Sequence, residues 1–112
     1  MKSLEDILKA NYSEEFDKLR KNRVVVSTHK YGPAKLNFGD KLVDGIGCLE
    51  KCIKKYKETG NTEYLLDAGN YCMFEFMYPQ IEGAYFKATD SKESAGIVGI
   101  SINEIKNFKE NS

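Results

Sequence analysis

The sequence predicts an all-α fold: a small helical bundle built on an antiparallel helical hairpin. Apolar residues recur at steps of three and four in two segments, about 40–57 and about 62–77, and this spacing marks one face of a helix. The connection ETGNT contains a glycine that ends a helix and an Asn-Thr pair that starts one. So short a connection makes the two helices antiparallel neighbours. A chain of 112 residues suits one hydrophobic core, so we expect residues 1–112 to form a single helical domain.

Composition narrows the class of function. The 17 basic and 17 acidic residues cancel, and no basic block is available to neutralise phosphates, so we expect no direct DNA or RNA binding. No apolar run approaches the ~20 residues that span a bilayer, and the N-terminus lacks the apolar core of a signal peptide. We therefore expect a cytoplasmic protein with no membrane association. Its three cysteines are an odd number, which favours reduced thiols over a disulfide framework.

Ahead of the hairpin, residues 3–23 predict an N-terminal helix. Ser3 is a candidate N-cap, followed by acidic residues in the first turn. Ser13 precedes two glutamates and resembles a second helix start, so NYS at 11–13 is a candidate interruption. The β-branched run Val24–Ser27 has no convincing partner strand, which favours a buried helix or an extended linker.

The stretch HKYGPAKLNFGD, His29–Asp40, connects this helix to the hairpin and carries the only histidine. Lys30 beside Tyr31 suits a ligand with a phosphate and a base, because bases stack on aromatic rings such as Tyr31 or Phe38. The alternative is structural: Tyr31 and Phe38 fold inward and Gly32 makes the turn. Residue types alone leave the two interpretations even.

The segment 62–77 carries two different faces. The face predicted to point into the bundle is apolar and consists of Leu65, Leu66, Gly69, Cys72, Met73, Phe76 and Met77. The opposite face mixes polar and aromatic residues: Glu63, Asp67, Asn70 and Phe74, with Tyr64, Tyr71 and Glu75 beside them. A helix facing only water does not normally carry three aromatics. We therefore expect this second face to meet something outside the subunit interior, and we expect a homo-oligomer.

Glu63, Asp67 and Asn70 are four and three residues apart, so their oxygens project from one helix face. Carboxylates and amides are oxygen ligands suited to Mg²⁺, and such an ion can bridge phosphate oxygens. The alternative is a solvated polar stripe or an interface stripe. After this helix, a long loop spans 79–100, and SINE at 101–104 predicts the capping box of a short C-terminal helix.

Along the chain, KYG is followed by N-F, a helix, G-N and LLDAGNYCMFEF. This order of motifs resembles small phage-encoded proteins of the dATP/dGTP diphosphohydrolase type. That family is MazG-like and consists of all-α nucleotide pyrophosphohydrolases. The resemblance covers about residues 29–77. The positions that match its motifs are Lys30, Tyr31, Gly32, Asn37, Phe38, Asp67 and Asn70. Together with Tyr71 from the neighbouring face they give a candidate nucleotide-binding set, while the acidic spacing described above gives a candidate metal pair. The nucleotide-binding set is Lys30, Tyr31, Gly32, Asn37, Phe38, Asn70 and Tyr71, and the metal pair is Glu63 and Asp67.

Two functions follow as expectations. The first is a nucleotide-binding protein that uses Mg²⁺ to cleave a nucleoside triphosphate to a monophosphate and pyrophosphate. The second is a non-enzymatic phage counter-defence protein, which sequesters a nucleotide or cyclic-nucleotide-like signal or inhibits a host defence protein. The sequence departs from MazG-like enzymes where their paired acids stand: Asp40, Asp44 and Glu50 lack the E-x-x-E spacing, and Tyr64 replaces an acid. These departures favour the second function, whereas the resemblance in KYG and D-x-x-N favours the first.

Overall fold

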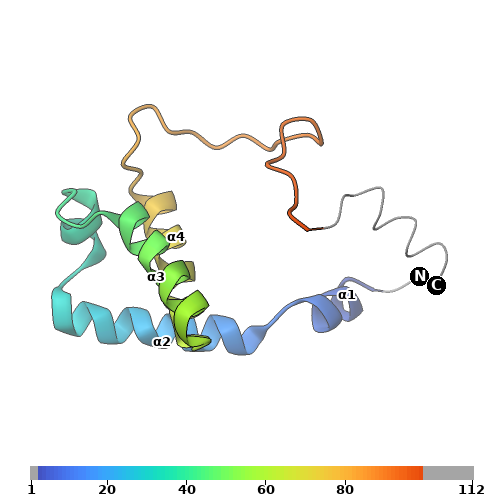
Figure 1. The fold of residues 1–112 in the computed structure, drawn as a ribbon, viewed down its shortest axis with the longest axis horizontal. Coiled ribbons are helices and arrows are strands. Elements are labelled where there is room, and N and C mark those ends of the chain that lie inside the picture. The colour runs from blue at the N-terminus through green and yellow to red at the C-terminus, as the bar shows by residue number, and fades with distance from the viewer. Residues whose placement is uncertain (1–2, 100–112) are drawn as a thin grey trace.

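The structure, a computed structural model, describes residues 3–99 and is all-α within them. Figure 1 shows the order of the elements along the chain. They are α1 (Leu4–Asn11), α2 (Glu14–Tyr31), the short π-helical turn η1 (Lys35–Gly39), α3 (Gly45–Thr59) and α4 (Glu63–Met77). α3 packs along α4 as an antiparallel hairpin, and α2 passes beneath the hairpin and contacts α4 (Figure 1). The predicted fold class and the predicted hairpin are both confirmed.

The turn of the hairpin uses the residues that the sequence indicated. Gly60 takes a left-handed conformation (φ 73°), and its N–H donates to the carbonyl of Tyr56 at 2.7 Å. Glycine reaches this conformation without a steric penalty. The Asn61 side chain then accepts from the N–H of Glu63 at 3.0 Å, which satisfies a free donor at the start of α4.

The start of α3 differs from the expectation. The periodicity placed it near Asp40, but α3 begins at Gly45 because the Asp44 carboxylate accepts from the N–H of Gly47 at 3.0 Å. A side chain that caps a helix fixes its first residue more strongly than an apolar repeat does. Lys41 has a positive φ of 58°, which no continuous helix allows. Leu42 is exposed and lies before α3, so it is not one of the apolar residues that pack along α4.

The N-terminal region consists of two helices, as the NYS motif indicated. Ser13 caps α2, since its hydroxyl accepts from the N–H of Phe16 at 3.0 Å. α2 then runs through Val24–Ser27 to Tyr31, which excludes a strand there. The connection is therefore shorter than predicted, because its first three residues, 29–31, are helical. Val25 and Val26 are exposed, so the expectation that this run is buried is wrong for them.

The burial of α4 differs from the prediction at several positions on both faces, although Leu66, Gly69 and Met73 of the predicted inner face are half-buried. Asn70 and Phe74, expected to face outward, are only 5% and 8% exposed, whereas Phe76, expected inside, is 72% exposed. The cause is α2, which brings two arginines against the polar face of α4. A buried amide or carboxylate needs such partners, and α2 supplies them.

We call these contacts the α2–α4 clamp; it consists of Arg20, Arg23, Asp67 and Asn70. Arg23 donates to both oxygens of Asp67, at 2.5 and 3.0 Å. Arg20 donates to the Asn70 side-chain oxygen at 3.3 Å, and the Asn70 amide donates to the Arg20 carbonyl at 3.0 Å. Gly69 permits this approach, because a Cβ there would lie 3.0 Å from the Phe16 ring.

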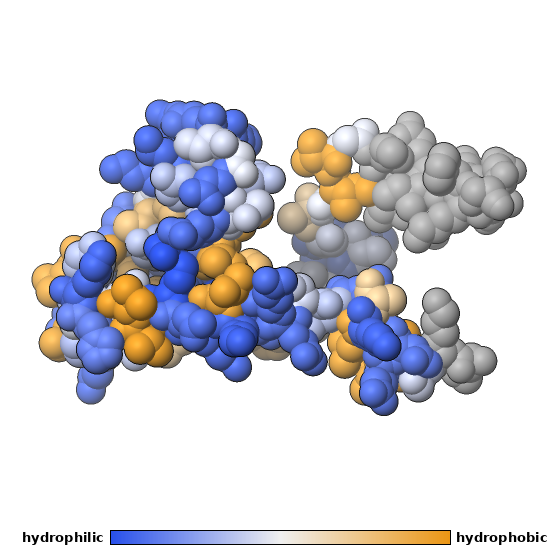
Figure 2. All heavy atoms as spheres, turned by 90° about the horizontal axis from the view of Figure 1, so that it is seen from below, coloured by the Kyte–Doolittle hydropathy of each residue, from blue (hydrophilic) through white to orange (hydrophobic). Residues whose placement is uncertain are grey.

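Little apolar surface is buried in the described part of the chain. Ala68 and Phe74 are its buried apolar side chains, and many large aliphatic and aromatic residues remain exposed. In Figure 2, apolar residues (orange) reach the surface between polar ones (blue). The radius of gyration is 17.5 Å, against about 13 Å for a compact domain of roughly 100 residues. The helices therefore form an open arrangement.

The segment after α4 has neither helix nor strand from Pro79 to residue 99, as predicted for the loop. The predicted C-terminal helix lies outside the described residues. Within residues 3–99, no helix is both long and apolar enough to cross a membrane.

We predict that Asn70→Ala lowers the free energy of unfolding by about 1–3 kcal/mol, because it removes two hydrogen bonds and leaves buried partners unsatisfied. Urea unfolding followed by circular dichroism measures the change. Asn22→Ala, at an exposed position of α2, is the matched control and should cost no more than about 0.5 kcal/mol. Equal stability of the two variants would show that the clamp does not hold α2 against α4.

Candidate ligand-binding site

A cavity of about 410 Å³ opens between the C-terminal half of α2, the turn that follows it, and α4. Its volume is within the usual range for small-molecule sites, roughly 300–1,000 Å³. We call it the α2–α4 cavity. It is lined by Val24, Ser27, Thr28, Tyr31, Gly32, Ala34, Asn37, Phe38, Val43, Asp67, Asn70, Tyr71 and Phe74.

One wall of the cavity is aromatic. The Phe38 ring stacks on Phe74 with centroids 4.6 Å apart, and it meets Tyr71 edge-on at 6.1 Å. Such pairs add to the stability gained by burial alone, so η1 is held against α4 by its single phenylalanine. Tyr31 behaves differently and is 72% exposed at the edge of the cavity. The sequence left open whether Tyr31 and Phe38 fold inward. In the structure Phe38 folds inward and Tyr31 does not.

Gly32 and Asn37 shape the cavity through the backbone. α2 ends at Gly32, where φ is 89°, a conformation that favours glycine. The Asn37 amide donates to the carbonyls of Tyr31 and Gly32 at 3.0 and 3.3 Å. These carbonyls are free at the end of a helix and require partners. Asn37 therefore fixes the chain where it leaves α2, and with it the position of the Tyr31 ring.

The carboxylates predicted to bind a metal are engaged by an arginine. Arg23 donates to both oxygens of Asp67 and lies 3.1 Å from a carboxylate oxygen of Glu63. The hydrogen bond that Arg23 donates to Asp67 is the main reason that the pKa of Arg23 is raised. A cation bound by this pair would have to displace the guanidinium group. Among the residues that the structure describes, no three His, Cys, Asp or Glu side chains cluster as metal ligands.

Tyr71 is the polar group whose ionisation the fold changes most clearly. Burial, reinforced by the nearby Cys48 and Cys52, raises the pKa of Tyr71 to about 12. Its hydroxyl therefore stays protonated at physiological pH and can donate a hydrogen bond. Burial also raises the pKa of Cys52, so this thiol stays neutral. Both cysteines are unpaired, in keeping with the expected reduced thiols.

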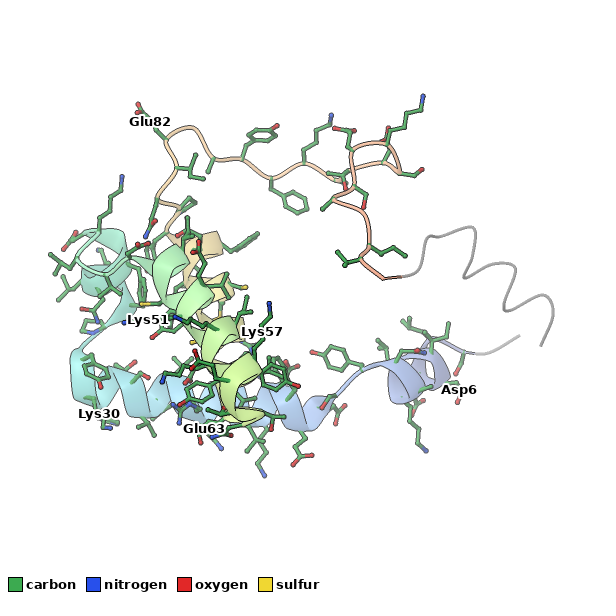
Figure 3. The ribbon with its side chains drawn as sticks, viewed as in Figure 1. Asp6, Lys30, Lys51, Lys57, Glu63 and Glu82 are labelled. Atoms are coloured by element: carbon green, nitrogen blue, oxygen red, sulfur yellow. The ribbon has the colours of Figure 1, made fainter. Side chains whose placement is uncertain are left out.

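The structure brings most of the predicted site residues to one cavity. Those that line it are Tyr31, Gly32, Asn37, Phe38, Asp67, Asn70 and Tyr71. Lys30 and Glu63 lie outside the lining, and Figure 3 labels them at the end of α2 and the start of α4.

Sequence reasoning missed the contribution of α2 to this cavity. Val24, Ser27, Thr28 and Tyr31 share one helix face at steps of three and four. That spacing was visible in the sequence, but it acquires meaning only once 24–28 is known to be helical. Without that knowledge the two hydroxyls of Ser27 and Thr28 had no reason to be grouped with Tyr31.

Comparison with protein-family models, with curated proteins and with solved structures finds no match for this chain. The relation to MazG-like pyrophosphohydrolases stays a prediction that rests on the KYG, N-F and DAGN motifs. KYG lies at the C-terminal end of α2, N-F lies within η1, and DAGN lies on α4. All three contribute residues to the α2–α4 cavity.

We predict that Tyr71→Phe flattens the pH dependence of stability between pH 10 and about 12. The unfolded chain ionises Tyr71 near pH 10, whereas the folded protein keeps it protonated to about 12. The contribution of Tyr71 to stability is therefore complete below pH 10 and is lost as the pH rises toward the folded value. Urea unfolding at stepped alkaline pH measures the effect.

Tyr85→Phe is the control for this experiment, because Tyr85 is exposed and lies outside the cavity. It should retain the alkaline loss of stability seen in the unmodified protein. If Tyr71→Phe and Tyr85→Phe gave the same pH profile, burial of the Tyr71 hydroxyl would be refuted.

Proposed function

We propose that the protein binds a nucleotide in the α2–α4 cavity, with the base among the aromatic side chains and the phosphates at the open end. The observation that carries the proposal is that one cavity of about 410 Å³ is lined by Tyr31, Phe38 and Tyr71, while Asn37 holds the chain that carries Tyr31. Aromatic rings stack on every base, and a few polar groups suffice to orient a ligand in an apolar pocket. The protonated Tyr71 hydroxyl supplies one such group.

Lys30 supports the proposal from outside the cavity. It is exposed and precedes Tyr31 in the last turn of α2. The carbonyls at this end of the helix carry partial negative charge, which repels phosphate. The ammonium group of Lys30 offsets that repulsion for phosphates that lie near the Tyr31 ring. Lys30 is therefore proposed to bind phosphate, while Tyr31 contacts the base.

Binding without cleavage is better supported than hydrolysis. Pyrophosphate release of the MazG-like kind would need Mg²⁺ on carboxylates such as Asp67 and Glu63. Arg23 neutralises both, at 2.5 and 3.1 Å. A partly buried bidentate pair has to be broken before either carboxylate is free, and breaking it leaves an unpaired charge. Mg²⁺ dependence thus discriminates between the two functions.

The second candidate function is a phage counter-defence protein that sequesters a nucleotide or cyclic-nucleotide-like signal. The Arg23–Asp67 pair favours it, because the cavity keeps its binding groups while its carboxylate stays engaged. Inhibition of a host defence protein through the aromatic face of α4 has less support. The central residue of that face, Phe74, is buried against Phe38.

We predict that a panel of nucleoside mono- and triphosphates and cyclic dinucleotides contains a ligand whose binding requires Tyr31. Tyr31→Ala should weaken that ligand roughly fivefold or more, since stacking on one base is worth about 1–3 kcal/mol. Tyr85→Ala removes an equally exposed tyrosine outside the cavity and should bind normally. Isothermal titration calorimetry gives the affinities, with and without Mg²⁺.

The same mixtures, assayed for pyrophosphate, report on cleavage. Intact nucleotide recovered in the presence of Mg²⁺ supports sequestration. Pyrophosphate release that disappears in Asp67→Asn would establish the hydrolase instead. The absence of binding by every nucleotide, or equal affinities in Tyr31→Ala and Tyr85→Ala, would refute the proposed site.

A further inference from the structure

α1 is an amphipathic helix whose apolar side has no packing partner in the described chain. Leu4, Ile7 and Leu8 lie on one side of it, and Leu4 and Leu8 are 73% and 50% exposed. The main helix packing of residues 3–99 joins α3 to α4 and α2 to α4, and α1 is not part of these two contacts. Figure 1 shows α1 set apart from the hairpin, and Figure 2 shows apolar and polar atoms side by side on it.

A helix of this length needs a partner. α1 has 8 residues, and isolated helices shorter than about 12–15 residues are marginal in water. Its capping box, formed by Ser3 and Asp6, satisfies free donors at the first turn. Capping alone does not offset the cost of ordering the chain, so the helix depends on burial of its apolar side.

The link to α2 directs α1 away from its own subunit. Tyr12 is extended, with φ −135° and ψ 150°. Its hydroxyl donates to the Asp17 carboxylate, which also lies 3.6 Å from the Arg20 guanidinium. Ser13 caps α2 at the same point. These contacts tie the link to the first turns of α2, and α1 would have to break them to fold back along α2.

An apolar groove lies close to this link. A cavity of about 270 Å³ lies between the first turns of α2 and the start of α4. Phe16, Leu19, Leu65 and Leu66 supply its apolar lining, and Glu15 lies at its edge. Phe16, Leu19 and Leu65 keep more than a third of their surface exposed.

We propose that two copies of the chain exchange α1, so that Leu4, Ile7 and Leu8 of each copy occupy the groove of the other. The proposed occupant is a second copy because the described residues carry an apolar helix and an apolar groove that do not meet, and the link keeps the two apart within the subunit. Lys9 on the polar side of α1 complements Glu15 at the groove edge. A reciprocal exchange closes as a twofold dimer, the commonest symmetry of homo-oligomers. The inference does not depend on nucleotide binding, because the groove and the α2–α4 cavity share no residue.

The test measures the mass of the full chain in solution by light scattering over a range of concentrations. The helix variant Leu4→Asp/Leu8→Asp and the groove variant Leu65→Asp should both be monomeric. Val25→Asp is the matched control: Val25 is an exposed aliphatic residue of α2 outside α1 and outside the groove. It should remain a dimer, like the unmodified protein. Because α1 is not packed firmly against another helix within residues 3–99, its variants should keep the helical content of the hairpin by circular dichroism.

Mixing the two monomeric variants provides a stricter test. The groove variant supplies an intact α1 and the helix variant supplies an intact groove, so one of the two exchange contacts remains. The mixture should therefore form a heterodimer, but only at a higher protein concentration than the unmodified protein needs to dimerise. A monomeric unmodified protein would overturn the proposal. So would a dimer that persists in the helix and groove variants, or a mixture that stays monomeric.

Discussion

Two arginines of α2 determine how the rest of the chain is arranged. Arg23 is bound to Asp67, and Arg20 is bound to Asn70, so the polar face of α4 is turned toward α2. An amide that is 95% removed from solvent requires partners of this kind. Once that face is inside, the opposite face of α4, with Phe76, is left outside. The exposure of Phe76 on α4 is consistent with this polar contact.

The same clamp creates the candidate site. It fixes the distance between α2 and α4, while Phe38 closes one end by stacking on Phe74. The space that remains is apolar and aromatic, with amide and hydroxyl groups at its wall. Within the clamp, Arg23 also binds Asp67, the carboxylate most suited to metal binding in this cavity. This arrangement is the reason that we propose nucleotide binding without cleavage.

Local signals in the sequence were sufficient for the hairpin and for the break before α2, since Gly60 and Ser13 act on their immediate neighbours. They were insufficient for α4, because hydropathy does not reveal that Arg20 will meet Asn70 fifty positions later. For the site, the KYG and DAGN motifs identified residues that do share a cavity. The cavity wall supplied by Ser27 could not be predicted while the structure of 24–28 was open.

The measurement that tests the clamp most directly is a double-mutant cycle of Arg23→Met and Asp67→Asn, followed by urea unfolding with and without Mg²⁺. If the two side chains stabilise the protein mainly through each other, their effects are not additive. The coupling energy should then be about 1 kcal/mol or more and independent of Mg²⁺. Additive effects would contradict this account. So would stabilisation by Mg²⁺ of the unmodified protein but not of the Asp67→Asn variant, because Asp67 would then bind a metal and not join α2 to α4.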